Sequence, residues 1–114
     1  MRAKSYVEAG ANGIMIHSKE KSGEDIKSFC ENFRKLNQDT PIIVVPSTFN
    51  HIKESEFIKW GVNVVIYANH MLRSSYPAML NVAKSILVNE RSSDCNDSCM
   101  PIKEILTLIP WTKW

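Results

Sequence analysis

The chain has 114 residues, of which 44% are hydrophobic, and its 14 Lys and Arg face 12 Asp and Glu. This composition is that of one small globular unit and excludes collagen-like, mucin-like and wholly disordered chains. Because the net charge is only +2 and no run concentrates Lys and Arg, we expect no nucleic-acid partner.

The sequence carries no pattern of export or membrane insertion. No apolar stretch approaches the roughly 18 residues of a membrane span, so we expect no membrane partner. Residues 1–6 lack the apolar core and the cleavage site of a secretory signal, which favours a cytoplasmic location. Cys30, Cys95 and Cys99 then fit reduced thiols better than a disulfide framework.

The first half of the chain alternates helical and strand patterns. Residues 2–9 predict the last turns of a helix that Gly10 ends. The apolar run 13–17 predicts a strand buried on both faces. Apolar residues at three- and four-residue spacings predict an amphipathic helix up to Leu36, and the β-branched run 41–46 predicts a second strand.

The second half continues the alternation and then becomes polar. We expect a short helix over 53–60, a third strand over 62–67 and a longer helix from about Leu72. Trp60 is most simply a packing residue between helix and sheet. We expect barrel-type βα units over 1–90, a polar linker over 91–101, rich in Ser, Asp and Asn, and a terminal helix over 102–110.

This order of elements predicts an α/β fold with a mainly parallel sheet. Three strands cannot close a barrel and leave two unprotected edges, so the unit resembles the last βα units of an eight-stranded (β/α) barrel, an incomplete barrel. A receiver-like domain is the complete alternative at this length. It is weakened because such folds have about five strands and because no strand here ends in Asp.

In parallel α/β folds the ligand site lies at the carboxyl ends of the strands, so the residues that follow each strand are candidates. His17 could donate a hydrogen bond to a substrate or move a proton, or it could cap a buried carbonyl. Ser47 could bind an anion or simply form a turn. Asn69 and His70 follow the third strand, and Asn69 could be a helix N-cap.

Metal-binding patterns are not found. Cys95 and Cys99 are separated by three residues and have no second Cys or His pair, so we interpret them as two linker thiols rather than a zinc site. The sequence has no paired-Asp motif, no glycine-rich phosphate loop and no acidic cluster suited to a divalent cation. We therefore assign no metal ligand.

Four segments, in order, resemble the C-terminal part of the phosphoenolpyruvate phosphomutase family, which belongs to the isocitrate lyase superfamily. They are 9–19 (AGANGIMIHSK), 41–47 (PIIVVPS), 61–73 (GVNVVIYANHMLR) and 100–106 (MPIKEIL). The resemblance implies a (β/α)8 TIM-type barrel whose last helices are exchanged between subunits of a homo-oligomer. It also implies the conversion of phosphoenolpyruvate to phosphonopyruvate, with Mg²⁺, at the head of phosphonate biosynthesis.

The resemblance carries His17 over as a catalytic donor that steadies developing oxyanion charge. Ser47, Asn69 and His70 match the pattern around the mouth of the site and are candidate substrate-binding residues. The family's metal-binding aspartates, its lid and its substrate-clamping arginine lie upstream of the matching segments, so we expect this fragment to lack the Mg²⁺ ligands and to be inactive alone. The alternatives are phosphonopyruvate hydrolase or another lyase of the superfamily, and a non-catalytic oligomerisation or interaction module.

Overall fold

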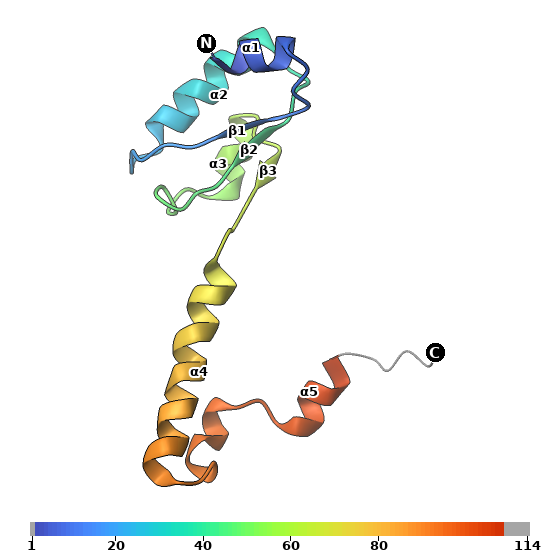
Figure 1. Ribbon diagram of the computed structural model, residues 1–114. Helices are drawn as coiled ribbons and strands as arrows, with labels where there is room; N and C mark the ends of the chain where they lie inside the picture. The colour runs from blue at the N-terminus through green and yellow to red at the C-terminus, as the bar shows by residue number, and fades with distance from the viewer. Residues whose placement is uncertain (1, 109–114) are drawn as a thin grey trace, which may run out of the picture. The chain divides into compact units, whose positions relative to one another are not determined.

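A computed structural model describes residues 2–108 of the chain (Figure 1). The chain divides after Ala68 into two compact units, called the first and the second unit below. The first unit holds α1 (Arg2–Glu8), β1 (Ile14–Ile16), α2 (Glu24–Leu36), β2 (Ile42–Val44), α3 (Glu54–Lys59) and β3 (Val64–Val65). The second unit holds α4 (His70–Asn89), the 3₁₀ helix η1 (Ser93–Ser98) and α5 (Ile102–Leu108).

The three strands form a parallel sheet in the order β1-β2-β3, which is also their order in the sequence. Ile14 pairs with Ile42, and Val44 lies between Ile16 and Val65. Each crossover runs through a helix, α2 or α3, as parallel strands require. The structure therefore confirms a mixed α/β fold with a small parallel sheet.

The core of the first unit lies between one face of this sheet and its helices. It is a single cluster with contributions from the three helices, the three strand regions and the loop after β2. Its members are Ala3, Ile14, Ile26, Cys30, Phe33, Ile42, Val44, Phe49, Phe57 and Val62. Trp60 packs edge to face on Phe57, with ring centroids 5.5 Å apart. Trp60 is also partly buried against the core cluster, as expected of a packing residue.

The opposite face of the sheet is also apolar but is not covered within the first unit. Met15 and Val64 point to this face and are 62% and 44% exposed, whereas Ile14 and Val44 on the core face are at most 5% exposed. Strands that are apolar on both faces are typical of sheets with cover on both sides.

Helix α2 has the apolar periodicity from which it was predicted. Its buried residues Ile26, Cys30 and Phe33 recur every three or four positions, so they share one face of the helix. Glu24 and Asp25 in the first turn and basic residues in the last turn have the signs that the helix dipole favours.

Arg34 joins the C-terminal end of α2 to the starts of the next two strands. Its guanidinium donates hydrogen bonds to the carbonyl oxygens of Gly61 (2.6 Å), Thr40 (2.9 Å) and Asn37 (3.2 Å), and to Oδ1 of Asn63 (2.7 Å). These contacts lie at the edge of the sheet where β2 and β3 begin, the edge opposite to the predicted site.

The second unit departs from the predicted elements in two ways. Helix α4 begins at His70 rather than near Leu72 and continues through Pro77, whose ring removes one backbone donor without ending the helix. Part of the stretch expected as a polar linker forms η1, which packs on α4 and buries Cys95. The terminal helix is observed as α5, and positions 109 and 110 of the predicted helix lie outside the described residues.

Within residues 2–108, no helix combines the length and the apolar character that crossing a membrane requires.

Candidate functional site

His17 and Ser47 follow two neighbouring parallel strands at the same edge of the sheet. His17 comes directly after β1 and Ser47 comes three residues after β2, and both are exposed. The backbone N–H of Ser47 donates to the carbonyl oxygen of Val45 at 2.8 Å, so Ser47 lies in a tight turn. Both residues therefore lie at the carboxyl ends of the strands, as the topology predicted.

Hydrogen bonds fix the loop that follows His17. Ser18 Oγ donates to Asp25 Oδ2 at 2.9 Å and accepts from the Glu20 N–H at 3.0 Å. The Glu20 carboxylate accepts from the N–H of Ser22 (2.6 Å), the Ser22 hydroxyl (2.7 Å) and the N–H of Gly23 (2.9 Å). The bonds from Ser22 hold the pKa of Glu20 below its ordinary value. The loop thus has a defined path from β1 to α2.

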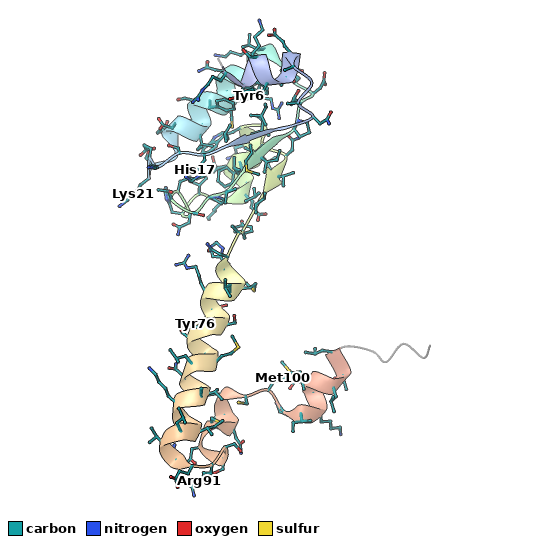
Figure 2. All side chains as sticks on the ribbon, in the orientation of Figure 1. Tyr6, His17, Lys21, Tyr76, Arg91 and Met100 are labelled. Carbon is teal, nitrogen blue, oxygen red and sulfur yellow. The ribbon has the colours of Figure 1, made fainter. Side chains whose placement is uncertain are left out.

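An open cavity of about 560 Å³ lies beside β1, at the edge of the sheet that β2 does not occupy. Tyr6 of α1 and His17 both line it, and Figure 2 labels these two side chains on the first unit. Ser18 and Asp25 add polar groups to the lining, and Phe29 belongs to its apolar part. A hydrogen-bond donor, a carboxylate and an apolar wall therefore meet in one cavity beside His17.

Asn69 and His70 belong to the second unit. Asn69 is the N-cap residue of α4, as predicted for one alternative, but its side chain makes no capping hydrogen bond. Its carbonyl oxygen accepts from the N–H of Arg73 at 2.9 Å. His70 is half-buried at the first position of α4. The clustering of these two residues with His17 and Ser47 stays a prediction.

Sequence reasoning missed several residues near the carboxyl ends of the strands. Glu20 and Asp25 were not singled out, although both fix the loop after His17. The Tyr67 hydroxyl, just beyond β3, donates to Glu54 Oε1 at 2.7 Å, and this bond raises the pKa of Tyr67. The alternation of Ser and Glu in the loop is a weak signal for Glu20. No spacing rule connects Ser18 with Asp25 or Tyr67 with Glu54.

In the part of the chain that the structure describes, no group of three or more His, Cys, Asp and Glu side chains could hold a metal ion. The donors that line the cavity beside His17 include a single carboxylate, that of Asp25. Mg²⁺ prefers several oxygen ligands in near-octahedral geometry, so these residues do not fit it. What they offer is hydrogen bonding and proton transfer.

The sheet and the site together define a class of protein. Parallel strands in sequence order, linked by helices, with polar residues at their carboxyl ends, are typical of α/β proteins that bind a ligand at that edge. A family model described as phosphoenolpyruvate phosphomutase matches residues 1–87. The chain belongs to the phosphoenolpyruvate phosphomutase family.

Individual relatives agree with this family. The chain is 34% identical over 107 residues to a phosphoenolpyruvate phosphomutase of Tetrahymena pyriformis, covering 94% of this chain and 35% of that protein. It resembles the crystal structure of phosphoenolpyruvate phosphomutase from Streptomyces platensis subsp. rosaceus with a TM-score of 0.83 and 30% identity, over 94% of this chain and 36% of that one.

A second activity is represented among the similar structures. Phosphonopyruvate hydrolase in complex with oxalate and Mg²⁺ matches with a TM-score of 0.78 and 29% identity, over 94% of this chain and 37% of that one. In all three comparisons the chain spans a little more than a third of the length of the protein that it matches.

Proposed function

We propose that this chain supplies the C-terminal βα units of a (β/α)8 barrel of the phosphoenolpyruvate phosphomutase type, and that the assembled barrel converts phosphoenolpyruvate to phosphonopyruvate. The observation that carries the proposal is the family match over residues 1–87. Because the chain spans about a third of its relatives, we expect it to be inactive alone and active when the rest of a barrel is present.

The uncovered surfaces of the first unit support assembly with further strands. β1 lies at an edge of the sheet with a cavity beside it, and Met15 and Val64 expose apolar side chains on the face away from the core. A free parallel edge exposes unpaired backbone groups. Further strands beside β1 would pair these groups, and closure of the barrel would bury the apolar face.

The position of His17 suits the proposed chemistry. In the reaction the bridging P–O bond of phosphoenolpyruvate breaks and a P–C bond forms to the methylene carbon, so negative charge develops on the enolate and phosphoryl oxygens. Such reactions depend mostly on positioning and charge stabilisation. His17 is exposed and follows β1 directly, at the carboxyl end of the strand. Its imidazole N–H would donate to one of these oxygens.

Ser47, Asn69 and His70 are the proposed substrate-binding residues at the mouth of the assembled site. Ser47 is exposed in its turn after β2, where its hydroxyl could donate to a carboxylate or phosphoryl oxygen. Asn69 and His70 would reach the same edge if α4 follows β3 as the eighth helix follows its strand in a barrel.

The described residues include no group of side chains that could hold Mg²⁺. A related structure, that of phosphonopyruvate hydrolase, contains Mg²⁺. We propose that the other βα units of the barrel supply the metal ligands, and that this chain contributes the donors at the ends of β1 and β2.

Phosphonopyruvate hydrolysis is the second candidate, because a phosphonopyruvate hydrolase structure matches almost as well as the mutase. In that reaction water takes the phosphoryl group and the C–P bond breaks, which yields pyruvate and phosphate. The two activities differ in the fate of phosphonopyruvate, so one assay distinguishes them.

The proposal further includes a homo-oligomer in which α5 is exchanged, with 1–90 in the barrel, 91–101 as a connector and 102–110 as the exchanged segment. Its support is the exposure of apolar side chains on α4 and α5, such as Met71 (79%), Leu87 (79%) and Ile102 (77%). Light scattering is expected to show a monodisperse dimer or tetramer of the assembled protein. A monomer would remove this part of the proposal and also the alternative of a non-catalytic oligomerisation module.

The experiment combines this chain with a polypeptide that carries the remaining two thirds of a phosphoenolpyruvate phosphomutase. A decarboxylase converts phosphonopyruvate to phosphonoacetaldehyde and CO2, which draws the unfavourable equilibrium forward, and phosphorus NMR follows the resulting C–P product. We expect product from the pair and none from either part. If the pair makes no product where an intact family enzyme does, the proposal fails, and release of pyruvate and phosphate from added phosphonopyruvate favours the hydrolase.

Two variants sharpen this experiment. His17→Ala is expected to lower the rate by about a hundredfold or more, the effect of losing one donor to developing oxyanion charge. Lys35→Ala is the control, because Lys35 is exposed in the last turn of α2, away from the carboxyl ends of the strands. Equal rates for the two variants would rule out His17 as the donor.

A further inference from the structure

Two thiols that the proposed function does not use lie together in the second unit. Cys95 sits within η1 and is 5% exposed, and Cys99, which caps the C-terminal end of η1, is exposed. Cys99 follows Cys95 by four residues, and its nearness is one cause of the raised pKa of the Cys95 thiol. The Cys95 thiol donates to the carbonyl oxygen of Ser92 at 3.0 Å. One thiol is thus accessible and the other is shielded directly beside it.

The surrounding backbone holds the pair in this arrangement. The N–H of Cys95 donates to the carbonyl oxygen of Ser92 at 3.1 Å, and the N–H of Cys99 donates to that of Asn96 at 3.0 Å. Arg91 makes two hydrogen bonds to the Asp94 carboxylate, at 2.7 and 3.1 Å, which tie the end of α4 to η1. η1 itself packs on α4. The thiols are therefore placed together by local structure.

We propose that Cys95 and Cys99 form a redox-active dithiol, which hydrogen peroxide converts into an intramolecular disulfide. The Cys99 thiolate attacks the peroxide, the O–O bond breaks, and water and a Cys99 sulfenic acid form. The sulfur of Cys95 then attacks the Cys99 sulfur, the S–O bond breaks, and a second water leaves. Two thiols and one peroxide thus give one disulfide and two waters.

The surroundings of each thiol assign these roles. Cys99 is exposed, so a peroxide can reach it. Burial, together with the neighbouring Cys99, raises the pKa of the Cys95 thiol above its ordinary value, so Cys95 is a poor first nucleophile. Cys30 is fully buried in the core of the first unit, and burial raises its pKa to about 11. Cys30 is therefore an internal reference thiol that should not react.

Formation of the bond requires the two sulfur atoms to reach a covalent separation of about 2.05 Å. Cys95 lies within η1 and Cys99 at its C-terminal end, so side-chain rotation and a shift within this one short helix would bring them together. All of the groups involved lie in the second unit. The inference therefore does not depend on the proposed mutase activity, and neither one's failure affects the other.

Peptide mass mapping of the reduced 114-residue chain after treatment with equimolar hydrogen peroxide tests the proposal. No Lys or Arg lies between 92 and 102, so trypsin leaves both thiols in one peptide, 92–103. We expect this peptide to lose the mass of two hydrogens, to resist alkylation and to recover both thiols with dithiothreitol. Oxidation of Met100 in the same peptide adds an oxygen and is distinguished by mass. Cys30 should remain alkylatable after unfolding.

Variants separate the assigned roles. In Cys95→Ser, Cys99 should accumulate as a sulfenic acid that dimedone traps, whereas in Cys99→Ser the remaining Cys95 should stay reduced. The matched control is the double variant Cys99→Ser with Ser93→Cys, which keeps two thiols but moves one to the start of η1. It should form the disulfide at least about tenfold more slowly, because the oriented contact is lost.

Two results would overturn the proposal. One is that Cys99 in the native chain accumulates as sulfinic acid or in intermolecular disulfides while Cys95 stays reduced. The other is that the displaced-thiol variant closes its disulfide as fast as the native chain, since the arrangement in the structure would then have no effect.

Discussion

The two units of this chain treat apolar side chains in opposite ways. In the first unit, Phe33 and Phe57 are 1% exposed within a core between sheet and helices. In the second unit, Leu87 and Val88 of α4 are 79% and 80% exposed, and among its described residues Cys95 is the one that is buried. The difference lies in the partners: each helix of the first unit has a sheet to pack on, whereas α4 has η1.

This contrast teaches that helical periodicity does not determine how a helix is stabilised. α2 is amphipathic and is held by the core that its apolar face joins. α4 is longer, contains Pro77 and has no buried residue among those described, so its stability must come from its own hydrogen bonds and from η1. Substitutions of apolar side chains should therefore have large effects in the first unit and small effects in the second, and the first of four predictions tests this.

Removal of a core ring should have the largest effect. Phe33→Ala is expected to lower the free energy of unfolding by about 3–5 kcal/mol, because it leaves a cavity in a packed core. Leu87→Ala on α4 is the control, with an expected change within about 0.5 kcal/mol. Urea unfolding followed by circular dichroism measures both. Similar losses for the two variants would mean that Leu87 is buried in the protein as it exists in solution.

A pair of glycines tests whether the tight packing of the first unit reaches its loops. Gly23 and Gly10 both have positive φ, at 83° and 100°, but a Cβ on Gly23 would collide with Cδ1 of Ile52, whereas a Cβ on Gly10 has no neighbour within 4 Å. Gly10→Ala should cost about 1–2 kcal/mol for the left-handed backbone alone. Gly23→Ala should cost about 1–3 kcal/mol more for the overpacking. Equal costs would show that Ile52 moves away freely.

Loss of the Arg34 contacts should have an intermediate effect. Arg34→Ala leaves the carbonyl oxygens of Gly61 and Thr40 without this donor, and we expect a loss of about 2–3 kcal/mol. Arg34→Lys should recover only part of it, because an ammonium cannot reproduce the planar fork. Full recovery by lysine in the same unfolding experiment would indicate that charge, rather than the hydrogen-bond geometry, is what matters.

Sequence patterns predicted the order of elements because each apolar run has a period that one type of structure satisfies. The continuous apolar run that contains Ile42–Val44 forms strand β2. The three- and four-residue spacing of Ile26, Cys30 and Phe33 forms the buried face of helix α2. η1 was missed because its Ser, Asp and Asn residues resemble a solvated linker and Cys95 is its one buried residue. A short helix with only one buried residue has no apolar periodicity from which it could be predicted.

The candidate site was predicted only where topology determines position. His17 follows β1 and Ser47 follows β2, and these strands are parallel neighbours. The order of elements in the sequence is therefore enough to predict that both residues lie at the carboxyl ends of the strands. The bonds of Glu20 and Asp25 depend on the path of a loop, which no periodicity describes. The place of Asn69 and His70 relative to His17 depends on the orientation of two units, which a local pattern does not contain.

The smallest effect concerns one carboxylate in each unit. The pKa of Glu20 lies below its ordinary value of 4.5 because Ser22 and Gly23 donate to it, and the pKa of Asp94 lies below 3.8 because of Arg91. In both cases the folded-state pKa is depressed, so the stabilisation is present above the ordinary value and is lost as the pH falls through the folded-state pKa. Carbon NMR of the two carboxyl groups follows these titrations.

Salt should separate these two carboxylates. The Arg91–Asp94 pair is an exposed ion pair whose attraction dissolved ions screen, whereas Glu20 is held by hydrogen bonds from neutral hydroxyl and amide groups of its own loop. In 1 M salt, at a Debye length of about 3 Å, the pKa of Asp94 should rise toward its ordinary value while that of Glu20 stays low. Glu20→Gln should abolish the acid-dependent shift of the Ser22 amide signal. If salt raises both pKa values equally, the low pKa of Glu20 is due to charge rather than to the hydrogen bonds of its loop. The loop after His17 would then be less rigid than its hydrogen bonds indicate.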